Sequence, residues 1–147
     1  MSERAKVAMT PDEVAAFLAG SNKVQLATIN PDGTPHLVTM FYGLLDDRIA
    51  FWTYAAAQKA RNLQRDPRLT CLVEDGEEYF ELRGVQVRGI AEPVPDVHAV
   101  GRLIASRLKG VPAEAVDAYV QQAARKRVAY VVNPTHVATW NHAHLLA

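Results

Sequence analysis

The residues with the clearest chemical potential lie in one short cationic segment. Positions 58–68 read QKARNLQRDPR and carry four cations, at Lys59, Arg61, Arg65 and Arg68. The composition favours a helix that begins just after an expected strand. A helix N-terminus offers free N–H groups and the positive end of the helix dipole, and Lys59 and Arg61 lie near it. The segment therefore indicates a phosphate-binding site; the alternative is a solvated helix face, which runs of charge usually form.

Aromatic and hydroxyl residues lead into this segment from two neighbouring expected strands. One strand ends in Trp52, Thr53 and Tyr54, and the preceding strand carries Thr39, Met40, Phe41 and Tyr42. Adjacent strands would present these residues around one mouth of a barrel, where a flat aromatic ligand could lie with its phosphate against Lys59. Plain core packing is the alternative, because methionine and aromatic residues on strands are commonly buried.

Several other kinds of site are excluded. The sequence has no GxSxG, Walker, GxGxxG, HExxH or CxxC motif. Cys71 is the only cysteine, so no intramolecular disulfide can form, and its place within an expected strand indicates a buried structural thiol. His136, His142 and His144 cluster near the C-terminus without cysteine or carboxylate neighbours, so no metal site is expected.

The bulk composition is that of an ordinary globular domain. The chain has 147 residues, of which 49% are apolar and 22% charged, and its formal net charge is zero. A single domain over 1–147 can bury a core at this length. A neutral chain lacks the basic surface that non-specific nucleic-acid binding requires. No apolar run is long enough for a signal peptide or a membrane span, so we expect a cytoplasmic protein without membrane or nucleic-acid partners.

The first half of the chain predicts a helix followed by a β-meander. Thr10, Pro11 and Glu13 form a helix-start signature, and the helix should end at Gly20. Tight turns rich in proline, aspartate and glycine then separate three strands, over 23–29, 34–45 and 48–54.

The middle of the chain predicts a helix and two strands. The helix over 55–68 should end before Pro67, because the residue preceding a proline disfavours helix. Strands are expected over 69–75 and 78–93, around an acidic hairpin turn. In the longer strand the alternation of apolar residues changes parity at Gly84, which predicts a β-bulge or barrel corner there.

The last third predicts two helices and the strands that close the sheet. Helices should begin after Asp96 and at Pro112, and the closing strands should cover 127–132 and 135–140, broken at Asn133-Pro134. Six or seven strands with interspersed helices predict a small α+β barrel.

Four blocks of the sequence, in series, resemble the split-barrel family related to pyridoxamine 5′-phosphate oxidase. They are LATINPDGTPHLVTMFY (26–42), KARNLQRDPRLTCLVE (59–74), YFELRGVQVRGIAEP (79–93) and RVAYVVNPTHVATW (127–140). With their spacers they cover nearly the whole chain, and they look closest to the short actinobacterial branch that contains reductases dependent on the deazaflavin coenzyme F-420. The resemblance implies an antiparallel split β-barrel of the FMN-binding type with flanking helices, working as a homodimer with two cofactor sites at the subunit interface.

The resemblance also implies roles for particular residues. The cofactor phosphate would be held by Lys59, Arg61 and Asn62. The ring system would lie against Val38, Thr39 and Met40, and the ribityl chain would be lined by Trp52 and Thr53. Trp140 would approach the site from the partner subunit or from the closing strand.

The implied chemistry is hydride transfer from F-420 to an electron-poor, flat, apolar small molecule stacked on Phe41. Tyr42, Tyr54 or ordered water would donate any proton. Two alternatives stay open: an FMN-dependent oxidoreductase on the same scaffold, and a cofactor- or haem-binding module without turnover. The tail WNHAHLLA lacks the arginine–histidine segment with which true pyridoxamine-phosphate oxidases bind substrate, so vitamin B6 synthesis is not expected.

Overall fold

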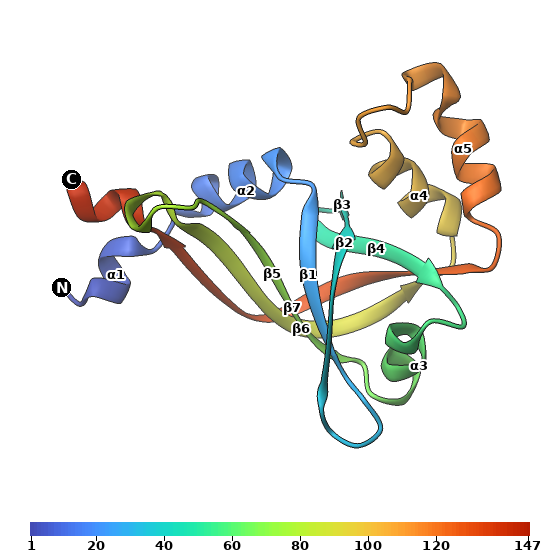
Figure 1. The fold of residues 1–147 in the computed structure, drawn as a ribbon, viewed down its shortest axis with the longest axis horizontal. Coiled ribbons are helices and arrows are strands. Elements are labelled where there is room, and N and C mark those ends of the chain that lie inside the picture. Colours follow the sequence, from blue (N-terminus) through green and yellow to red (C-terminus); the bar gives the residue numbers. More distant parts are fainter.

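The fold is a single curled antiparallel sheet with helices at its two ends (Figure 1). The computed structural model describes residues 1–147. Its seven strands are ordered β2-β1-β5-β6-β7-β4-β3, which confirms the expected α+β split-barrel architecture. The strands are β1 (Lys23–Ile29), β2 (Pro35–Phe41), β3 (Gly43–Leu45), β4 (Arg48–Tyr54), β5 (Arg68–Asp75), β6 (Arg83–Val94) and β7 (Arg127–Asn141).

Five α-helices and three short 3₁₀ turns complete the chain. The 3₁₀ turns are η1 (Tyr79–Glu81), η2 (Ala113–Ala115) and η3 (His142–Leu146). In Figure 1 the two termini lie together at one end of the molecule, and α3 and the α4–α5 pair lie at the other. The helices are α1 (Glu3–Val7), α2 (Pro11–Gly20), α3 (Gln58–Arg65), α4 (Val97–Ala105) and α5 (Val116–Ala123).

The helix starts predicted at Thr10 and Asp96 are confirmed by capping hydrogen bonds, whereas the helix expected at Pro112 begins as η2 with α5 starting at Val116, and the one expected from residue 55 starts at Gln58. The Thr10 hydroxyl accepts a bond from the Glu13 N–H, and the Glu13 carboxylate accepts one from the Thr10 N–H. Asp96 caps α4 by accepting a bond from the Ala99 N–H. Both contacts satisfy N–H groups that have no partner within the helix.

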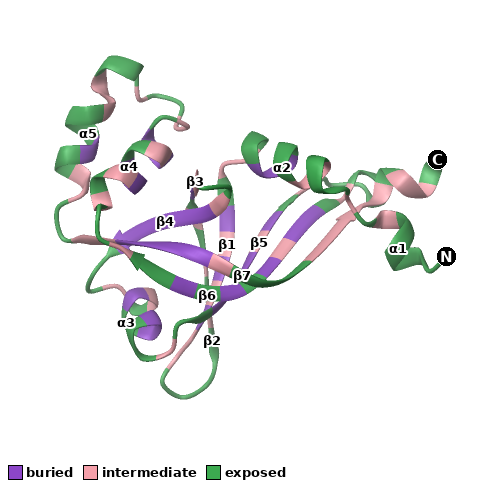
Figure 2. Ribbon diagram, turned by 180° about the vertical axis from the view of Figure 1, so that it is seen from behind, coloured by how far each residue is buried: buried purple, intermediate pink, exposed green.

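Apolar side chains form two core clusters, on either side of the sheet's curl. The larger one lies inside the curl and is closed by Phe17 and Leu18 of α2 and by Leu63 of α3. It includes Cys71, which is fully buried; burial raises the pKa of this thiol to about 12 and confirms its structural role. The smaller cluster packs α4 and α5 against Trp52 of β4 and the start of β7. Figure 2 shows both as buried stretches of strand.

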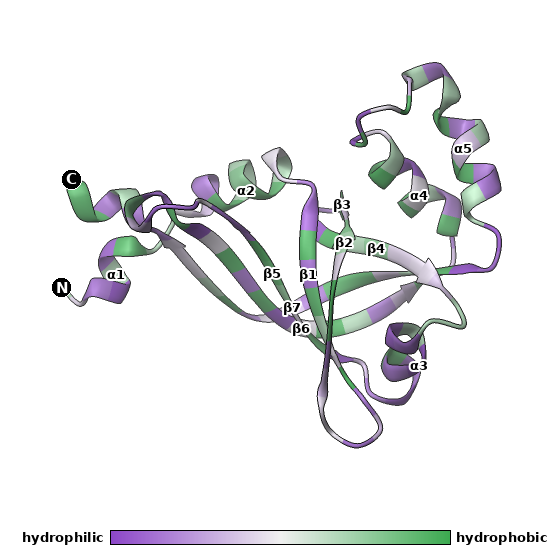
Figure 3. Ribbon diagram, viewed as in Figure 1, coloured by the Kyte–Doolittle hydropathy of each residue, from purple (hydrophilic) through white to green (hydrophobic).

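Hydropathy distinguishes α3 from the other helices (Figure 3). It is hydrophilic over most of its surface, and its buried residues are Ala60, Asn62 and Leu63. Such a helix contributes little hydrophobic burial, so its position depends on specific polar contacts.

The long strands depart from prediction in three places. The strand expected over 34–45 divides at Tyr42, whose side chain turns into the core. The strand expected over 78–93 begins only at Arg83, after η1. The predicted break at Asn133-Pro134 is wrong, because β7 runs through it as one strand.

The bulge predicted at Gly84 is also wrong. The pairing of β6 with β7 shifts register between Arg88 and Gly89, where Thr135 is the extra residue on β7. A bulge at this point accommodates Pro134, which cannot donate a ladder hydrogen bond. Gly84 instead allows close packing of Trp140 on β6, because a Cβ at this position would lie 2.2 Å from the indole of Trp140.

Over β1, β2, β5 and β6 the face of the sheet that points away from the larger core cluster carries no helix, whereas over β4 and β7 it is covered by α4 and α5. Alternate residues of β1, β2, β5 and β6 point away from the core, and several apolar ones are exposed. Leu37 is 70% exposed and Phe41 49%. No helix is long and apolar enough to span a membrane.

Candidate functional site

A cleft of about 350 Å³ opens where the two edges of the sheet approach each other. The sheet curls, so that β2 at one edge and β4 near the other edge contribute to the same cleft. The tertiary structure brings together seven residues singled out from the sequence, namely Thr39, Met40, Phe41, Trp52, Thr53, Tyr54 and Lys59.

Four further residues line the cleft that the sequence did not single out. Ile104 and Leu108 come from α4 and the residues after it, and Tyr119 comes from α5. The fourth, Arg127, is the first residue of β7 and is paired with Tyr54 of β4. Only Arg127 gave a usable signal in the sequence, as the last cation of the run Arg125–Arg127. The other three read as ordinary helix residues.

Two cations in the cleft lack a negative partner. Lys59 and Arg127 take part in none of the chain's salt bridges, and no aspartate or glutamate lines the cleft. Burial lowers the pKa of Lys59, and the neighbouring Arg127 lowers it further. A site with this charge distribution favours an anionic ligand.

Arg127 is held by aromatic rings rather than by acceptors. Its guanidinium carbon lies 4.8 Å from the ring centre of Trp52 and 4.4 Å from that of Tyr54. Its Nε atom is buried and has no hydrogen-bond partner. Cation–π contacts fix the position of the side chain but do not satisfy its N–H donors.

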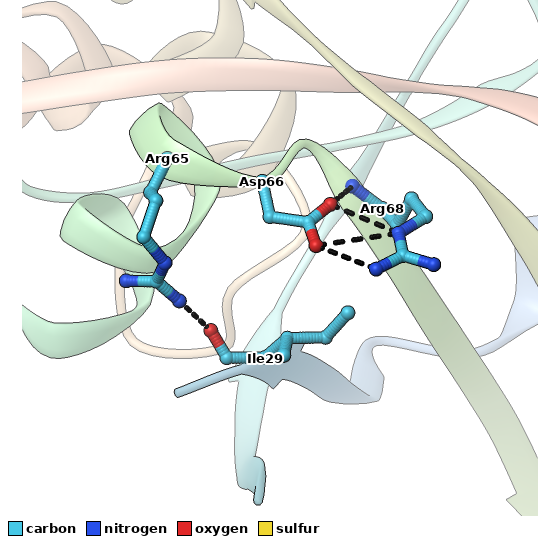
Figure 4. A network of polar contacts seen from close by, with 4 residues as sticks. All are labelled: Ile29, Arg65, Asp66 and Arg68. Atoms are coloured by element: carbon cyan, nitrogen blue, oxygen red, sulfur yellow. Dashed lines mark hydrogen bonds and ion pairs between the residues drawn. The ribbon is translucent and has the colours of Figure 1, made fainter. Parts of the chain in front are cut away.

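The four cations of the 58–68 segment have different surroundings, and Figure 4 shows two of them, Arg65 and Arg68. Arg65 donates a hydrogen bond to the Ile29 carbonyl, and Arg68 donates a bidentate pair of hydrogen bonds to the Asp66 carboxylate. The hydrogen bonds from Arg68 lower the pKa of Asp66 to about 2. These two arginines fasten the end of α3.

Arg61 is exposed and does not line the cleft, so Lys59 alone of the four faces it.

Asn62 is fully buried and lies outside the cleft. Its amide nitrogen donates to the Thr28 hydroxyl and to the Asn30 side-chain oxygen, at 3.0 Å each. Its amide oxygen accepts a bond of 2.8 Å from Gln58. With its polar atoms already paired within the protein, Asn62 ties α3 to β1, and the geometry argues against the predicted phosphate contact.

Tyr42 also lies outside the cleft, although it was a candidate proton donor. Its hydroxyl donates a 2.6 Å hydrogen bond to the Leu18 carbonyl, and Arg107 lies over its ring. Burial raises the pKa of the buried phenol. These contacts assign Tyr42 to the core, and they argue against the predicted role. Tyr54, which is 55% exposed at the cleft, stays a candidate.

Val38 and Trp140 do not reach the cleft of their own chain. Val38 is partly buried and packs against the larger core cluster. Trp140 lies at the opposite end of β7 from Arg127, about 40 Å away at the usual rise per strand residue. The closing strand therefore cannot bring Trp140 to this cleft, which leaves a second subunit as the remaining prediction.

The fold and this cleft define a flavin-type split barrel. The chain belongs to the pyridoxamine 5′-phosphate oxidase family, whose model matches residues 10–141. The family takes its name from an oxidase, so the chain is a member of an oxidoreductase family.

The similarity to curated relatives is partial. A pyridoxine/pyridoxamine 5′-phosphate oxidase of Rhodopseudomonas palustris is 31% identical over 80 residues, which are 53% of this chain and 36% of that enzyme. The match thus spans about a third of the length of the curated relatives.

Solved structures give more complete matches. A conserved hypothetical protein of Mycobacterium tuberculosis, Rv2991, is 39% identical with a TM-score of 0.92, covering 100% of this chain and 94% of the other. An F-420 reductase is 28% identical with a TM-score of 0.59, over 84% of this chain and 94% of the other. The haem storage protein HutZ of Vibrio cholerae, at 17% identity and a TM-score of 0.67 over 88% and 94%, shares the fold.

Proposed function

We propose that this protein is a reductase that binds coenzyme F-420 in the cleft and passes hydride to a flat, electron-poor, apolar molecule. One observation carries the proposal: Lys59 lies partly buried in an aromatic cleft with no carboxylate to neutralise it. The F-420 reductase among the similar structures supports the choice of cofactor.

The residues present fit a phosphorylated, ring-bearing cofactor. Lys59 would hold the phosphate, while Thr39 and Met40 on β2 would lie against the ring system and Trp52 and Thr53 would line the connecting chain. When bound, F-420 supplies a two-electron hydride donor.

The protein's own contribution is positioning and exclusion of water. Ile104 and Leu108 form an apolar wall that keeps solvent from the bound ring, and Phe41 offers an aromatic surface for the substrate. Of the two tyrosines predicted as proton donors, only Tyr54 lines the cleft, and its hydroxyl would hold a proton near the ring.

FMN is the second candidate cofactor, because Lys59 suits its phosphate equally well and the family is named for a flavin-type oxidase. A haem-binding module is less well supported. No histidine or cysteine lines the cleft, so the two commonest protein ligands of haem iron are missing there, and only Met40, Tyr54 and Tyr119 are of ligating types.

A second copy of the chain would complete the site. The helix-free face of the sheet, with Leu37 and Phe41 exposed, provides an apolar surface for dimer formation. A dimer would let Trp140 of one subunit approach the cleft of the other. A cytoplasmic location is part of the same proposal, since the single buried thiol of Cys71 suits a reducing compartment.

Cofactor titration tests the proposal. Purified protein is titrated with F-420 and with FMN, and binding is followed by cofactor fluorescence. We expect Lys59→Ala to weaken binding about 10- to 100-fold, the usual loss for a charged hydrogen bond. Lys6→Ala, an exposed lysine of α1 at the other end of the molecule, is the control and should bind normally.

Turnover is tested with reduced cofactor and electron-poor acceptors such as quinones and nitroaromatics. We expect oxidation of the cofactor to depend on enzyme and acceptor. A wild-type protein that binds neither cofactor would contradict the proposal.

A further inference from the structure

We infer that Arg127 is a second anion-binding residue of the cleft, and that it selects phosphorylated ligands over their phosphate-free counterparts. The inference rests on the proposed function, which assigns the cleft to a phosphorylated ring.

Arg127 differs from the other half-buried arginines, Arg48 and Arg107, which both have acceptors. Arg107 donates to the carbonyls of Leu18, Ala19 and Ser21, which end α2. Arg48 contacts the Asn133 side-chain oxygen and lies 3.7 Å from the Glu92 carboxylate.

Arg127 has no such acceptor, and its Nε is both buried and unpaired. An unpaired buried donor costs free energy, so a structural arginine would be expected to have found a partner.

Strand pairing and two ring contacts fix the position of the Arg127 side chain in the absence of ligand. Arg127 begins β7 and is fixed by the ladder with β4, where it is paired with Tyr54. The rings of Trp52 and Tyr54 lie within 4.8 Å of its guanidinium carbon. A donor held by strand pairing and ring contacts loses little conformational freedom on binding, which favours affinity.

Lys59 and Arg127 are two cations that line the same cleft. Burial lowers the pKa of Lys59, and repulsion by the nearby Arg127 lowers it further. A phosphate between them would remove this repulsion and would accept hydrogen bonds from both side chains. The guanidinium fork suits two phosphate oxygens, and the ammonium supplies a point charge.

If Arg127 binds phosphate, its loss should lower the affinity for phosphorylated ligands and leave the affinity for phosphate-free ligands almost unchanged. If Arg127 were purely structural, its loss would change the shape of the cleft and would lower the affinity for both kinds of ligand alike.

The experiment compares FMN with riboflavin, and F-420 with its chromophore lacking the phosphate. Dissociation constants are measured for wild type and Arg127→Gln. We expect Arg127→Gln to weaken the phosphorylated ligand about 10- to 100-fold and its phosphate-free counterpart by less than about 3-fold. Arg127→Lys should recover part of the loss. Arg125→Gln, which removes an exposed cation two positions away, should behave as wild type.

Equal weakening of both ligands by Arg127→Gln would overturn the inference and leave the proposed function intact. Retained binding of the phosphate-free ligand shows that the variant is folded.

A second measurement separates the two proposals. Thermal unfolding is followed with added inorganic pyrophosphate, which needs no redox ring. We expect a rise in Tm for wild type and for Arg125→Gln but not for Arg127→Gln. If wild type binds no flavin or deazaflavin, the proposed function fails, and this arm still tests Arg127: an equal Tm rise in Arg127→Gln, or none in wild type, overturns the inference.

Discussion

At the scale of single residues, cationic side chains that look equivalent in the sequence have different surroundings in the structure. Lys59, Arg61 and Arg65 lie within one helix, yet the first faces the cleft, the second faces solvent and the third binds a carbonyl of β1. Lys59 and Arg61 are two positions apart and lie on nearly opposite sides of the helix, whereas Arg61 and Arg65 share a face and differ because Arg65 reaches the Ile29 carbonyl.

The lowered pKa of Lys59 predicts a pH dependence of ligand affinity. Desolvation and the adjacent Arg127 favour the neutral amine, so Lys59 loses its proton at a lower pH than an ordinary lysine. We expect affinity for FMN or F-420 to fall as the pH rises through this pKa, below 10.5. Riboflavin affinity should not follow the same curve, and Lys59→Arg should keep its affinity to higher pH. Titrations from pH 7 to 10.5 check this.

The same shift predicts the sign of an effect on stability. In the ligand-free protein the folded state binds fewer protons than the unfolded state between the two pKa values of Lys59, so stability should rise with pH across that window. Urea unfolding of wild type and Lys59→Met should show the difference; parallel pH curves for the two proteins would count against it.

At the scale of elements, α3 is positioned by polar contacts and α4 by close packing. Asn62 joins α3 to β1, whereas Gly101 lets α4 lie directly on Trp52. The first contact positions the helix that carries Lys59, and the second positions Trp52 against α4, so both help to define the shape of the cleft.

Asn62→Ala is predicted to destabilise the protein by about 1–3 kcal/mol, because the Thr28 hydroxyl and the Asn30 amide lose a buried partner. Denaturant unfolding measures the effect. Arg61→Ala, one residue away and exposed, should change stability by less than about 0.5 kcal/mol. If Asn62→Ala were as stable as wild type, the tether between α3 and β1 would be unimportant.

Gly101→Ala is predicted to lower both stability and cofactor affinity, although Gly101 does not line the cleft. A Cβ there would lie 2.4 Å from the Trp52 ring, so the ring or the helix must move. Overpacking of this kind costs about 1–3 kcal/mol, despite the higher helix propensity of alanine. The control is Gly20→Ala in α2, where no atom lies within 4 Å of the added methyl group. Unfolding curves and cofactor titrations of both variants give the comparison.

At the scale of the whole molecule, the curled sheet has an inner face filled by α2, α3 and the core. Its outer face is covered by α4 and α5 over β4 and β7 and carries no helix over β1, β2, β5 and β6. The ends of the long β6–β7 pair lie far apart, with Arg127 near one and Trp140 near the other. One chain cannot bring both to one site, which is the structural reason for proposing a dimer.

Leu37→Asp tests the dimer. Leu37 is 70% exposed and lies on the helix-free face, so a charge there should leave the monomer fold intact and disrupt an apolar interface. We expect light scattering to show a dimer for wild type and a monomer for the variant, with weaker cofactor binding. Ala15→Asp, at an exposed position of α2 away from the helix-free face, should leave the assembly unchanged. A monomeric wild type would contradict the dimer.

The sequence alone determined the local structure and identified seven of the residues that line the cleft. Capping at Thr10 and Asp96, the end of α3 before Pro67, and the strand order along the chain are local effects of backbone preference and apolar alternation. Residues 39–41 and 52–54 line the same cleft, as predicted, but the predicted reason is wrong. The expected β-meander does not form, because β2 pairs with β1 and β4 pairs with β3 and β7; the curl of the sheet brings the two segments together.

Only the tertiary structure decided which polar groups are free. Asn62 and Tyr42 share the sequence character of site residues, yet buried partners far along the chain occupy their polar atoms. Arg127, 68 positions after Lys59, reaches the same cleft through the pairing of β7 with β4. Satisfaction of a hydrogen-bonding group depends on contacts between distant segments, and such contacts exist only once the sheet has curled and its edges have met.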